Sequence, residues 1–289
     1  MSDFLILLLI INLSFDLIFS KTTRNRLKLR LMTYNIHYGN DINNKYNIEL
    51  IGKVIKESKA EIICLQEVDK NWGTRSNYEN LIEILSKITG YEYFYAPIYD
   101  KLSERGIFYP NEQFGIGFLS KYKIIKSYNY NISRWSTQKE DPQPGDINFP
   151  PKKGGFGNIL IDVNGKLISI YNTHLDFRPT PPPGYDKSIR EIQVKEMLEI
   201  IDKNTYPLIL MGDMNTDTSS KEIFIPLFQI FNDAWTIPNK ENGFTFPSDH
   251  PNIRIDYILT SKKDIIVKNA YLLYTTVSDH LPVIIDIEL

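Results

Sequence analysis

Hydrophobic and polar residues repeat with two different periods along the first part of the chain, and these periods predict its elements. LKLRLMTYNIH (27–37) begins with apolar and polar residues in alternation, which is typical of a strand with one buried face. NIELIGKVIKES (47–58) repeats isoleucine at helical spacing, whereas EIICLQEV (61–68) is mostly apolar, as in a buried strand. A second helical stripe stops at Gly90. The chain up to this glycine therefore predicts strand, helix, strand, helix.

Beyond Gly90 the pattern becomes that of consecutive strands. Asn164-Gly165 separates two of them and is a strong signal for a hairpin turn. A helix is expected at about 185–203, before the buried strand that follows Pro207. The strand-like segments are YEYFYAP (91–97), FGIGFLS (114–120), KIIKSYNYNI (123–132), GGFGNILIDV (154–163), KLISIYNTHL (166–175), RIDYILT (254–260), DIIVKNAYLLY (264–274) and LPVIIDIEL (281–289).

Two such halves, each a sheet with helices outside it, predict a four-layer α/β sandwich with two mixed, mostly antiparallel β-sheets and helices on the outer faces. The 289 residues are 42% hydrophobic and 24% charged, which is the ordinary range for a globular protein. Because no composition break or internal repeat divides the chain, we expect a single domain over residues 27–289.

Residues 1–20 have a different character. The run 4–11 is unbroken and apolar, but Asn12 and Asp16 interrupt the stretch after it, so the segment is too short for an ordinary membrane span. It is more similar to a signal peptide, although no Lys or Arg precedes the apolar run. We expect a secreted chain beginning near Lys21. An uncleaved membrane anchor and a core helix are the alternatives.

The charge and cysteine content exclude some classes of function. The chain has 33 Lys and Arg against 35 Asp and Glu, a net charge of −2, so no general positive field favours tight non-specific binding to nucleic acid. The single cysteine, Cys64, excludes an internal disulfide and lies in an apolar run, which predicts a buried thiol without a catalytic role.

Polar residues with chemical capacity recur at the ends of the predicted strands. In GDMN (212–215), Asp213 and Asn215 are two positions apart and project to one side if the extended backbone continues. By itself this stretch is equally typical of an Asx turn. The complete set, with no cysteine partner, suits Mg²⁺ or Mn²⁺ acting on a phosphate better than structural zinc. It comprises Asn35, Glu67, His174, Asp213 with Asn215, Asp256, and Asp279 with His280.

The motifs around these residues resemble those of the endonuclease/exonuclease/phosphatase superfamily. That superfamily includes pancreatic deoxyribonuclease, abasic-site endonucleases, neutral sphingomyelinases and inositol-phosphate phosphatases. The resemblance implies the same four-layer sandwich and covers residues 30–289. Its motifs, in the family's order, are TYNIH (33–37), LQEVD (65–69), GIGFLSKY (115–122), NTHLD (172–176), IREIQ (189–193), GDMN (212–215), FTFPSD with RIDYIL (244–259) and SDHLPV (278–283).

The resemblance implies a metal site and a set of catalytic residues. Glu67 would be the main ligand of Mg²⁺, or alternatively Mn²⁺, helped by Asn35 and Asp279. Asp213 would orient or deprotonate the attacking water, and Asn215 would hold that water or a phosphate oxygen.

Two histidines complete the implied machinery. His280 would bind the scissile phosphate while Asp256 holds its other nitrogen, an arrangement that raises the imidazole pKa and keeps the ring cationic. As an imidazolium, His174 would stabilise the phosphate or protonate the leaving oxygen.

Further residues are candidates for contact with substrate. Arg190 precedes the helical stripe that contains Val194, so its side chain points toward the sheet. A surface salt bridge is the alternative to the phosphate-binding or site-organising role that the resemblance implies. Phe246 lies in the family's substrate loop. Asp249 and His250 repeat the Asp-His pair, but they lie in a proline-flanked loop, so we expect them at the rim, outside the site.

These observations predict a metal-dependent phosphoesterase, with a phosphodiester as the expected substrate, that uses direct in-line attack of water. The irregular stretches 134–157 and 176–188 would form the rim, and they supply basic residues for one or two phosphates beside apolar residues suited to a lipid or a compact headgroup. We therefore expect a lipid- or inositol-linked phosphoester substrate and a monomer without a stable protein partner. A nuclease acting on DNA or RNA is the first alternative, and a catalytically dead binding module is the second. The basic rim residues are Arg134, Lys152, Lys153, Arg178 and Lys187, and the apolar ones are Trp135, Phe149, Phe156, Phe177 and the Pro181 run.

Overall fold

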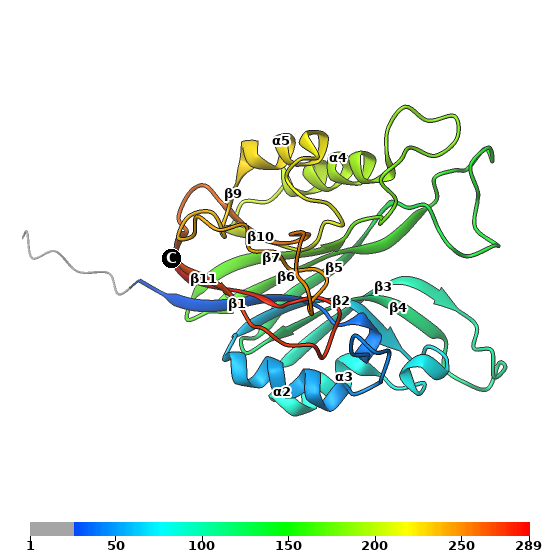
Figure 1. Cartoon of the computed structure of the whole chain (residues 1–289), viewed down its shortest axis with the longest axis horizontal. Coiled ribbons are helices and arrows are strands. Elements are labelled where there is room, and N and C mark those ends of the chain that lie inside the picture. The colour runs from blue at the N-terminus through cyan, green and yellow to red at the C-terminus, as the bar shows by residue number, and fades with distance from the viewer. Residues whose placement is uncertain (1–25) are drawn as a thin grey trace, which may run out of the picture.

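Two six-stranded β-sheets stack face to face, and helices cover their outer faces (Figure 1). The computed structural model describes residues 26–289, so the predicted signal or anchor segment lies outside the described part. These four layers confirm the predicted α/β sandwich. No helix among residues 26–289 is long and apolar enough to cross a membrane.

The first sheet has the strand order β11-β12-β1-β2-β4-β3. Only β1 and β2 are parallel, and the other neighbouring pairs are antiparallel. Two helices, α2 and α3, lie on its outer face, below the sheets in Figure 1. The elements are β1 (Lys28–Asn35), α2 (Ile48–Ser58), β2 (Ile62–Lys70), α3 (Leu81–Thr89), β3 (Glu92–Lys101), β4 (Glu112–Ser120), β11 (Ile266–Leu272) and β12 (Val283–Glu288), with short 3₁₀ turns η1 (His37–Gly39) and η2 (Thr74–Ser76).

The second sheet has the order β5-β6-β7-β8-β10-β9. Here β7 and β8 are parallel and the remaining pairs are antiparallel. Two helices, α4 and α5, cover its outer face. The elements are β5 (Ile124–Ser133), β6 (Lys152–Val163), β7 (Lys166–His174), α4 (Ile189–Ile201), β8 (Leu208–Asp213), α5 (Lys221–Ile230), β9 (Phe231–Asp233) and β10 (Asp256–Ser261).

Because helices and the facing sheet cover each sheet on both sides, alternate residues of one strand enter different cores. In β2, Cys64 packs between the sheets, whereas Ile63 and Leu65 pack against α2 and α3. The Cys64 thiol is buried, and burial raises its pKa well above the ordinary value. Its position agrees with a packing role.

A bulge in β2 sets the geometry of the strand ends. Leu65 pairs with Gly117 but Val68 pairs with Gly115, so two residues of β2 face one residue of β4. One of these two is Glu67, which adopts a left-handed φ of 54°. The side chain of Asn172 donates to the carbonyls of Leu65 and Gly117, each at 3.0 Å. An amide from the second sheet therefore supports the bulge of the first.

The second sheet and the segments that cover it differ from the sequence prediction in three ways. Helix α5 and strand β9 were not predicted, because Pro226 and the apolar run around it show no clear stripe. Helix α4 is shorter than the predicted 185–203 and begins at a capping box formed by Ser188 and Glu191. Phe149 and Phe156 are buried, so the expectation that they form an apolar rim is wrong.

Gly212 allows β8 to lie close to β7 at the strand ends. Its φ is 152°, and a Cβ there would lie 2.1 Å from the carbonyl oxygen of Thr173. Gly212 pairs with Thr173 and Asp213 pairs with His174, so the glycine fixes the distance between two residues of the predicted site.

We predict that Gly212→Ala lowers the free energy of unfolding by about 3 kcal/mol or more, because overpacking adds to backbone strain. Gly165→Ala is the control, since Gly165 has a φ of 85° with open space around it, and should cost only the left-handed strain of about 1 kcal/mol. Urea unfolding measures both. Equal losses would contradict the close approach of β7 and β8.

Candidate active site

The predicted site residues meet where strand ends of both sheets come together. The amide nitrogen of Asn35 donates to Glu67 at 3.2 Å and to Asp213 at 3.1 Å, which joins the first sheet to the second. The backbone N–H of His37 donates to the Asn35 oxygen at 3.1 Å and fixes the orientation of the amide. His174 at the end of β7 and His280 just before β12 contact this group, Asp256 at the start of β10 contacts His280, and Asp279 lies 3.8 Å from His37.

Asp256, His280 and Asp213 form a buried chain of charges. The Nδ1 atom of His280 lies 2.8 Å from the Asp256 carboxylate, and its Nε2 atom lies 3.8 Å from that of Asp213. Burial alone would lower the pKa of His280, but the charge and hydrogen bond of Asp256, with the charge of Asp213, raise it to about 10. At neutral pH the ring is a cation aimed at Asp213.

Asp213 is the carboxylate best suited to take up a proton. Burial, followed by the charge of Asp256, raises its pKa to about 7, against the opposing effect of His280. The backbone N–H of Asn215 donates to Asp213 at 2.7 Å from a residue with a left-handed φ of 52°. A carboxylate held in this way lies between its two protonation states near neutral pH, as a general base requires.

Arg190 organises the loop that follows Asp213. Its side chain is buried, and its Nη1 atom donates to the carbonyl of Asn215. The side chain of Asn215 donates to the carbonyl of Leu175 at 3.0 Å, so the loop is tied both to α4 and to the residue after β7. The Arg190 side chain points toward the sheet, as the sequence predicted. Because it is buried, the alternative of a surface salt bridge is excluded.

His174 approaches the same carboxylate oxygen of Asp213 as His280 does. Its Nε2 atom lies 3.5 Å from Asp213 and 4.0 Å from Glu67. Burial, then the positive charges of Arg134 and His280, lower its pKa to about 3. The structure therefore favours a neutral ring over the imidazolium that the sequence suggested.

The surroundings of Glu67 fit a divalent cation. Burial raises the pKa of its carboxyl group, and its one side-chain hydrogen bond among the described residues comes from the neutral Asn35 amide. Asp279, whose charge also raises the pKa of Glu67, adds a second hard oxygen donor; its carboxylate accepts from the Ser278 hydroxyl at 3.4 Å and lies 3.8 Å from His37. A cation here would offset the cost of burying Glu67.

Asp213, Asp256 and His280 form a second group whose donor atoms lie within 4.8 Å of one another. This group is less suited to a metal. A metal ligand must be a neutral imidazole, whereas His280 is held as a cation by two carboxylates. The geometry instead suits proton transfer and the binding of an anion.

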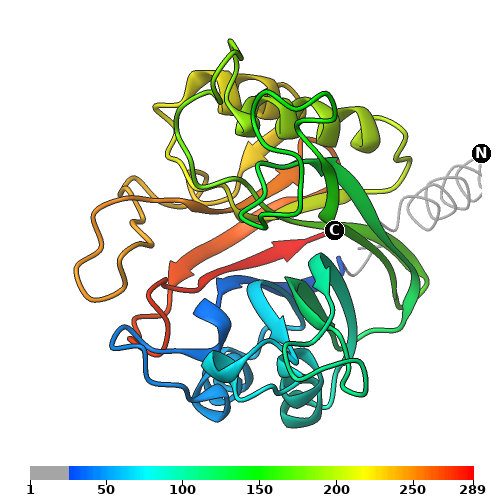
Figure 2. The ribbon, with the colours of Figure 1, turned by 90° about the vertical axis from the view of Figure 1, so that its right-hand side faces the viewer.

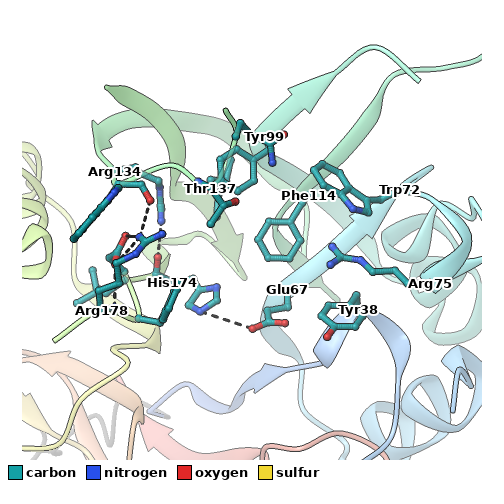
Figure 3. Close-up of a pocket in the computed structure, with 16 residues that line it drawn as sticks. Tyr38, Glu67, Trp72, Arg75, Tyr99, Phe114, Arg134, Thr137, His174 and Arg178 are labelled. Carbon is teal, nitrogen blue, oxygen red and sulfur yellow. Dashed lines mark hydrogen bonds and ion pairs between the residues drawn. The ribbon is translucent and has the colours of Figure 1, made fainter. Parts of the chain in front are cut away.

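A cavity of about 260 Å³ opens beside Glu67 and His174 (Figure 3). Figure 2 faces the side of the molecule on which the long loops gather. The loop after β5 supplies Trp135 and Thr137, and the loop after β7 supplies Phe177, so both predicted rim loops reach the cavity. Buried Arg134 supports its floor by donating to the carbonyls of His174, Gly154 and Gly155 at 2.9–3.1 Å.

Several wall residues were missed by the sequence analysis. Trp72 and Arg75 follow β2, Tyr38 lies in η1, and Tyr99 and Phe114 come from β3 and β4. These residues carry no shared motif, and their proximity depends on the fold. The alternation of aromatic residues with arginine in these loops was the one available signal.

The remaining predicted residues are Phe246, which lies beside His280, and the pair Asp249 and His250, which lies at the surface. The Phe246 ring packs beside that of His280, with 4.9 Å between ring centroids. His250 pairs with Asp249 at 3.0 Å, but its side chain is 87% exposed, so this Asp-His pair lies at the surface.

Comparison with known families assigns the fold. Residues 32–280 match the model of the Endonuclease/Exonuclease/phosphatase family. No curated protein sequence matches the chain.

Solved structures share the architecture at low sequence identity. An endonuclease/exonuclease/phosphatase from Beutenbergia cavernae DSM 12333 is 20% identical, with a TM-score of 0.72 over 91% of this chain and 72% of that one. The human Nocturnin catalytic domain with bound sulfate is 22% identical, with a TM-score of 0.60 and coverages of 91% and 97%. Sphingomyelinase C from Streptomyces griseocarneus is 16% identical, with a TM-score of 0.57 and coverages of 90% and 99%. At these identities the similarity is one of fold.

We predict strong energetic coupling within the buried Asp256–His280 pair. His280→Gln and Asp256→Asn should each cost about 3 kcal/mol of unfolding free energy, and the double variant should cost less than their sum, because each single change leaves one buried partner unpaired. Asp249→Asn and His250→Gln form the matched surface cycle, which should show no measurable coupling. Urea unfolding measures both cycles, and similar coupling in the two would contradict the buried charge chain.

Proposed function

Because the chain belongs to the endonuclease/exonuclease/phosphatase family, whose members are hydrolases of phosphoester bonds, we propose that it cleaves a phosphoester by in-line attack of water with the help of a divalent cation. The observation that carries this proposal is the position of Asp213 between cationic His280 and neutral His174. A water at Asp213 has a proton acceptor on one side and a cation for the phosphoryl group nearby.

The proposed reaction needs no covalent enzyme intermediate. The water oxygen forms a bond to phosphorus, its proton passes to Asp213, and the bond from phosphorus to the ester oxygen breaks. The ester oxygen leaves as an alkoxide, which takes up a proton from solvent to give the alcohol. His280 remains a cation throughout, because Asp256 holds its Nδ1 atom, and it stabilises negative charge on the phosphoryl oxygens. His174, as a neutral donor, orients Asp213 or a phosphoryl oxygen.

Glu67 and Asp279 would hold the cation, with the Asn35 oxygen as a third donor through its second lone pair. The bound cation would neutralise charge on the phosphate and polarise it for attack. Mg²⁺ suits this set of hard oxygen donors, and Mn²⁺ is the alternative.

The state of the basic residues supports a compact substrate. Arg178 pairs with Asp176 at 2.9 Å, Lys153 with Asp141 at 2.6 Å and Lys152 with Glu196 at 3.4 Å. A protein that follows a nucleic-acid backbone needs several free cations in a row. We therefore favour a small or lipid- or inositol-linked phosphoester over duplex DNA. We also propose that the enzyme is a monomer and that it is secreted or membrane-associated, as the sequence predicts.

Two alternatives remain distinct in their observable behaviour. A nuclease would show a steep dependence of affinity on salt. A catalytically dead binding module would bind phosphoesters without turnover, but it has no chemical need for a carboxylate whose pKa is raised to about 7 beside a cationic histidine.

We predict that chelation of divalent cations abolishes hydrolysis without unfolding the protein, and that Mg²⁺ restores it. Glu67→Gln should raise the Mg²⁺ concentration for half-maximal activity by about tenfold or more, because a neutral amide is a weaker ligand. Glu288→Gln, at the end of β12, is the control. Turnover with a chemically defined diester, with circular dichroism alongside, measures these effects, and full activity in excess chelator would remove the metal from the mechanism.

Substitution of the catalytic groups should separate the two Asp-His pairs. We expect Asp213→Asn and His280→Gln each to lower turnover by about 10²–10⁴-fold, the range typical of a positioned proton-transfer group. Asp249→Asn and His250→Gln should leave turnover nearly unchanged, because that pair is exposed. An inactivating His250→Gln with a mild His280→Gln would show that the chemistry belongs to the surface pair instead.

A further inference from the structure

We infer that the cavity beside Glu67 and His174 binds a single uncharged ring bearing oxygen acceptors, attached to the scissile phosphate, and discriminates against a quaternary ammonium group. This inference rests on the proposed phosphoester hydrolysis and names the part of the substrate that the cavity selects. Sugar, inositol and nucleoside rings share the required chemistry.

Cations of the chain already occupy the aromatic rings of the cavity wall. Arg75 lies 4.1 Å from the Tyr38 ring centroid, 5.3 Å from Trp72 and 5.5 Å from Phe114. Lys101 also approaches Trp72, at 4.8 Å. Lys153 lies 5.7 Å from Tyr99, and Arg178 lies 4.5 Å from both Trp135 and Phe177. These are all six aromatic residues that line the cavity.

This arrangement removes the usual basis for binding a quaternary ammonium. An aromatic cage attracts such a cation through the negative faces of its rings. Here a lysine or arginine of the chain already lies within cation–π distance of each ring. The positive charge of that side chain repels a ligand cation that approaches the same ring. The wall resembles an ammonium cage in composition, but its aromatic rings are already paired with cations of the chain.

The same cations do not create a trap for several phosphates. Asp69 binds Arg75 through two hydrogen bonds of 2.7 and 2.8 Å, and Asp176 and Asp141 pair with Arg178 and Lys153. The charges are therefore largely compensated. A ligand that is neither cationic nor multiply anionic suits such a wall.

Arg75 supplies the donors for such a ligand. Its Nε and Nη2 atoms bond Asp69, whereas Nη1 bonds no group in the described part of the chain, and the side chain is 37% exposed. Figure 3 shows its guanidinium directed between Tyr38 and Phe114 toward the cavity. Thr137, on the opposite wall, adds a hydroxyl group. Oxygen acceptors on a bound ring would therefore accept hydrogen bonds from Nη1 of Arg75 and from the Thr137 hydroxyl group.

The volume of the cavity suits one enclosed ring, and a larger ligand would extend out of it. Its volume of about 260 Å³ is below the range of about 300–1,000 Å³ that holds drug-sized molecules. An acyl chain or a base pair exceeds it. Stacking of a neutral ring between Phe114 and Tyr99, whose own centroids are 6.1 Å apart, is excluded, so the ring lies against one aromatic edge of the wall.

The test uses chromogenic p-nitrophenyl phosphodiesters that differ only in the second alcohol. We expect kcat/KM for the ribose and myo-inositol esters, each of which offers one ring, to exceed that for the choline ester by about tenfold or more. The dimethylbutyl ester, an uncharged carbon analogue of choline, should also exceed the choline ester, which isolates the effect of charge from that of shape. A choline ester hydrolysed as well as its uncharged analogue would overturn the inference. The two ring esters then identify the preferred source of the ring.

A charge-balanced variant tests the role of Arg75. Asp69→Asn with Arg75→Gln removes the cation without leaving a buried charge unpaired, and it should reduce the discrimination against choline by about fivefold or more. The control is Asp286→Asn with Arg30→Gln, which removes a similar pair in which Arg30 lies 5.6 Å from the ring of Tyr271, at another place on the first sheet. An unchanged choline ratio in the folded Asp69/Arg75 variant would contradict the inference. Should that variant fail to fold, the wild-type comparison of esters still decides.

Failure of the inference is distinguishable from failure of the proposed function. If neither the p-nitrophenyl diesters nor p-nitrophenyl phosphate is hydrolysed with Mg²⁺ present, the proposed function is wrong and the inference falls with it. If the diesters are hydrolysed, and Asp213→Asn abolishes this, but the choline ester is preferred, the inference alone is wrong.

Discussion

The site depends on the hydrogen bonds that side-chain amides make between the two sheets. Asn35 joins Glu67 of the first sheet to Asp213 of the second, and Asn172 donates to the carbonyls of Leu65 and Gly117, the pair that precedes the β2 bulge. Gln66 completes this contact by donating to Asn172 at 2.7 Å. Because these amides are buried, an unpaired one would cost about 1–3 kcal/mol. The relative position of the sheets, and with it that of the carboxylates, is therefore tightly specified.

This framework holds a group of charges that is costly by itself. Asp213 and Asp256 are buried beside the partly buried Glu67, and burial raises the pKa of Glu67 and of Asp213. His280 offsets part of the cost, and a bound cation would offset more. Glu67 and Asn215 also adopt left-handed backbone conformations. Such strain persists only where the surrounding structure fixes it, and here it fixes groups that bind and activate a water and a phosphate.

The sequence predicted the layers and most strands, because alternating and apolar runs between turn residues define them without knowledge of the fold. It also predicted Asn35, Glu67, His174 and Asp213 as candidate site residues, since they follow such runs directly, although Glu67 lies in a bulge within β2 and not at the end of the strand. Helix α5 was not predicted from the sequence because Pro226 interrupts its pattern of apolar residues. The cavity could not be predicted, because Arg75 and Trp135 come from loops far apart in the chain, and the neutral state of His174 depends on charges brought near it by folding.

The central claim is that water held by Asp213 attacks phosphorus directly. The most direct test is the stereochemical course of hydrolysis, with a phosphorothioate diester of one handedness cleaved in isotopically labelled water. Direct attack predicts inversion at phosphorus, with the label in the phosphorus-containing product. Retention of configuration would require a covalent enzyme intermediate and would contradict the account.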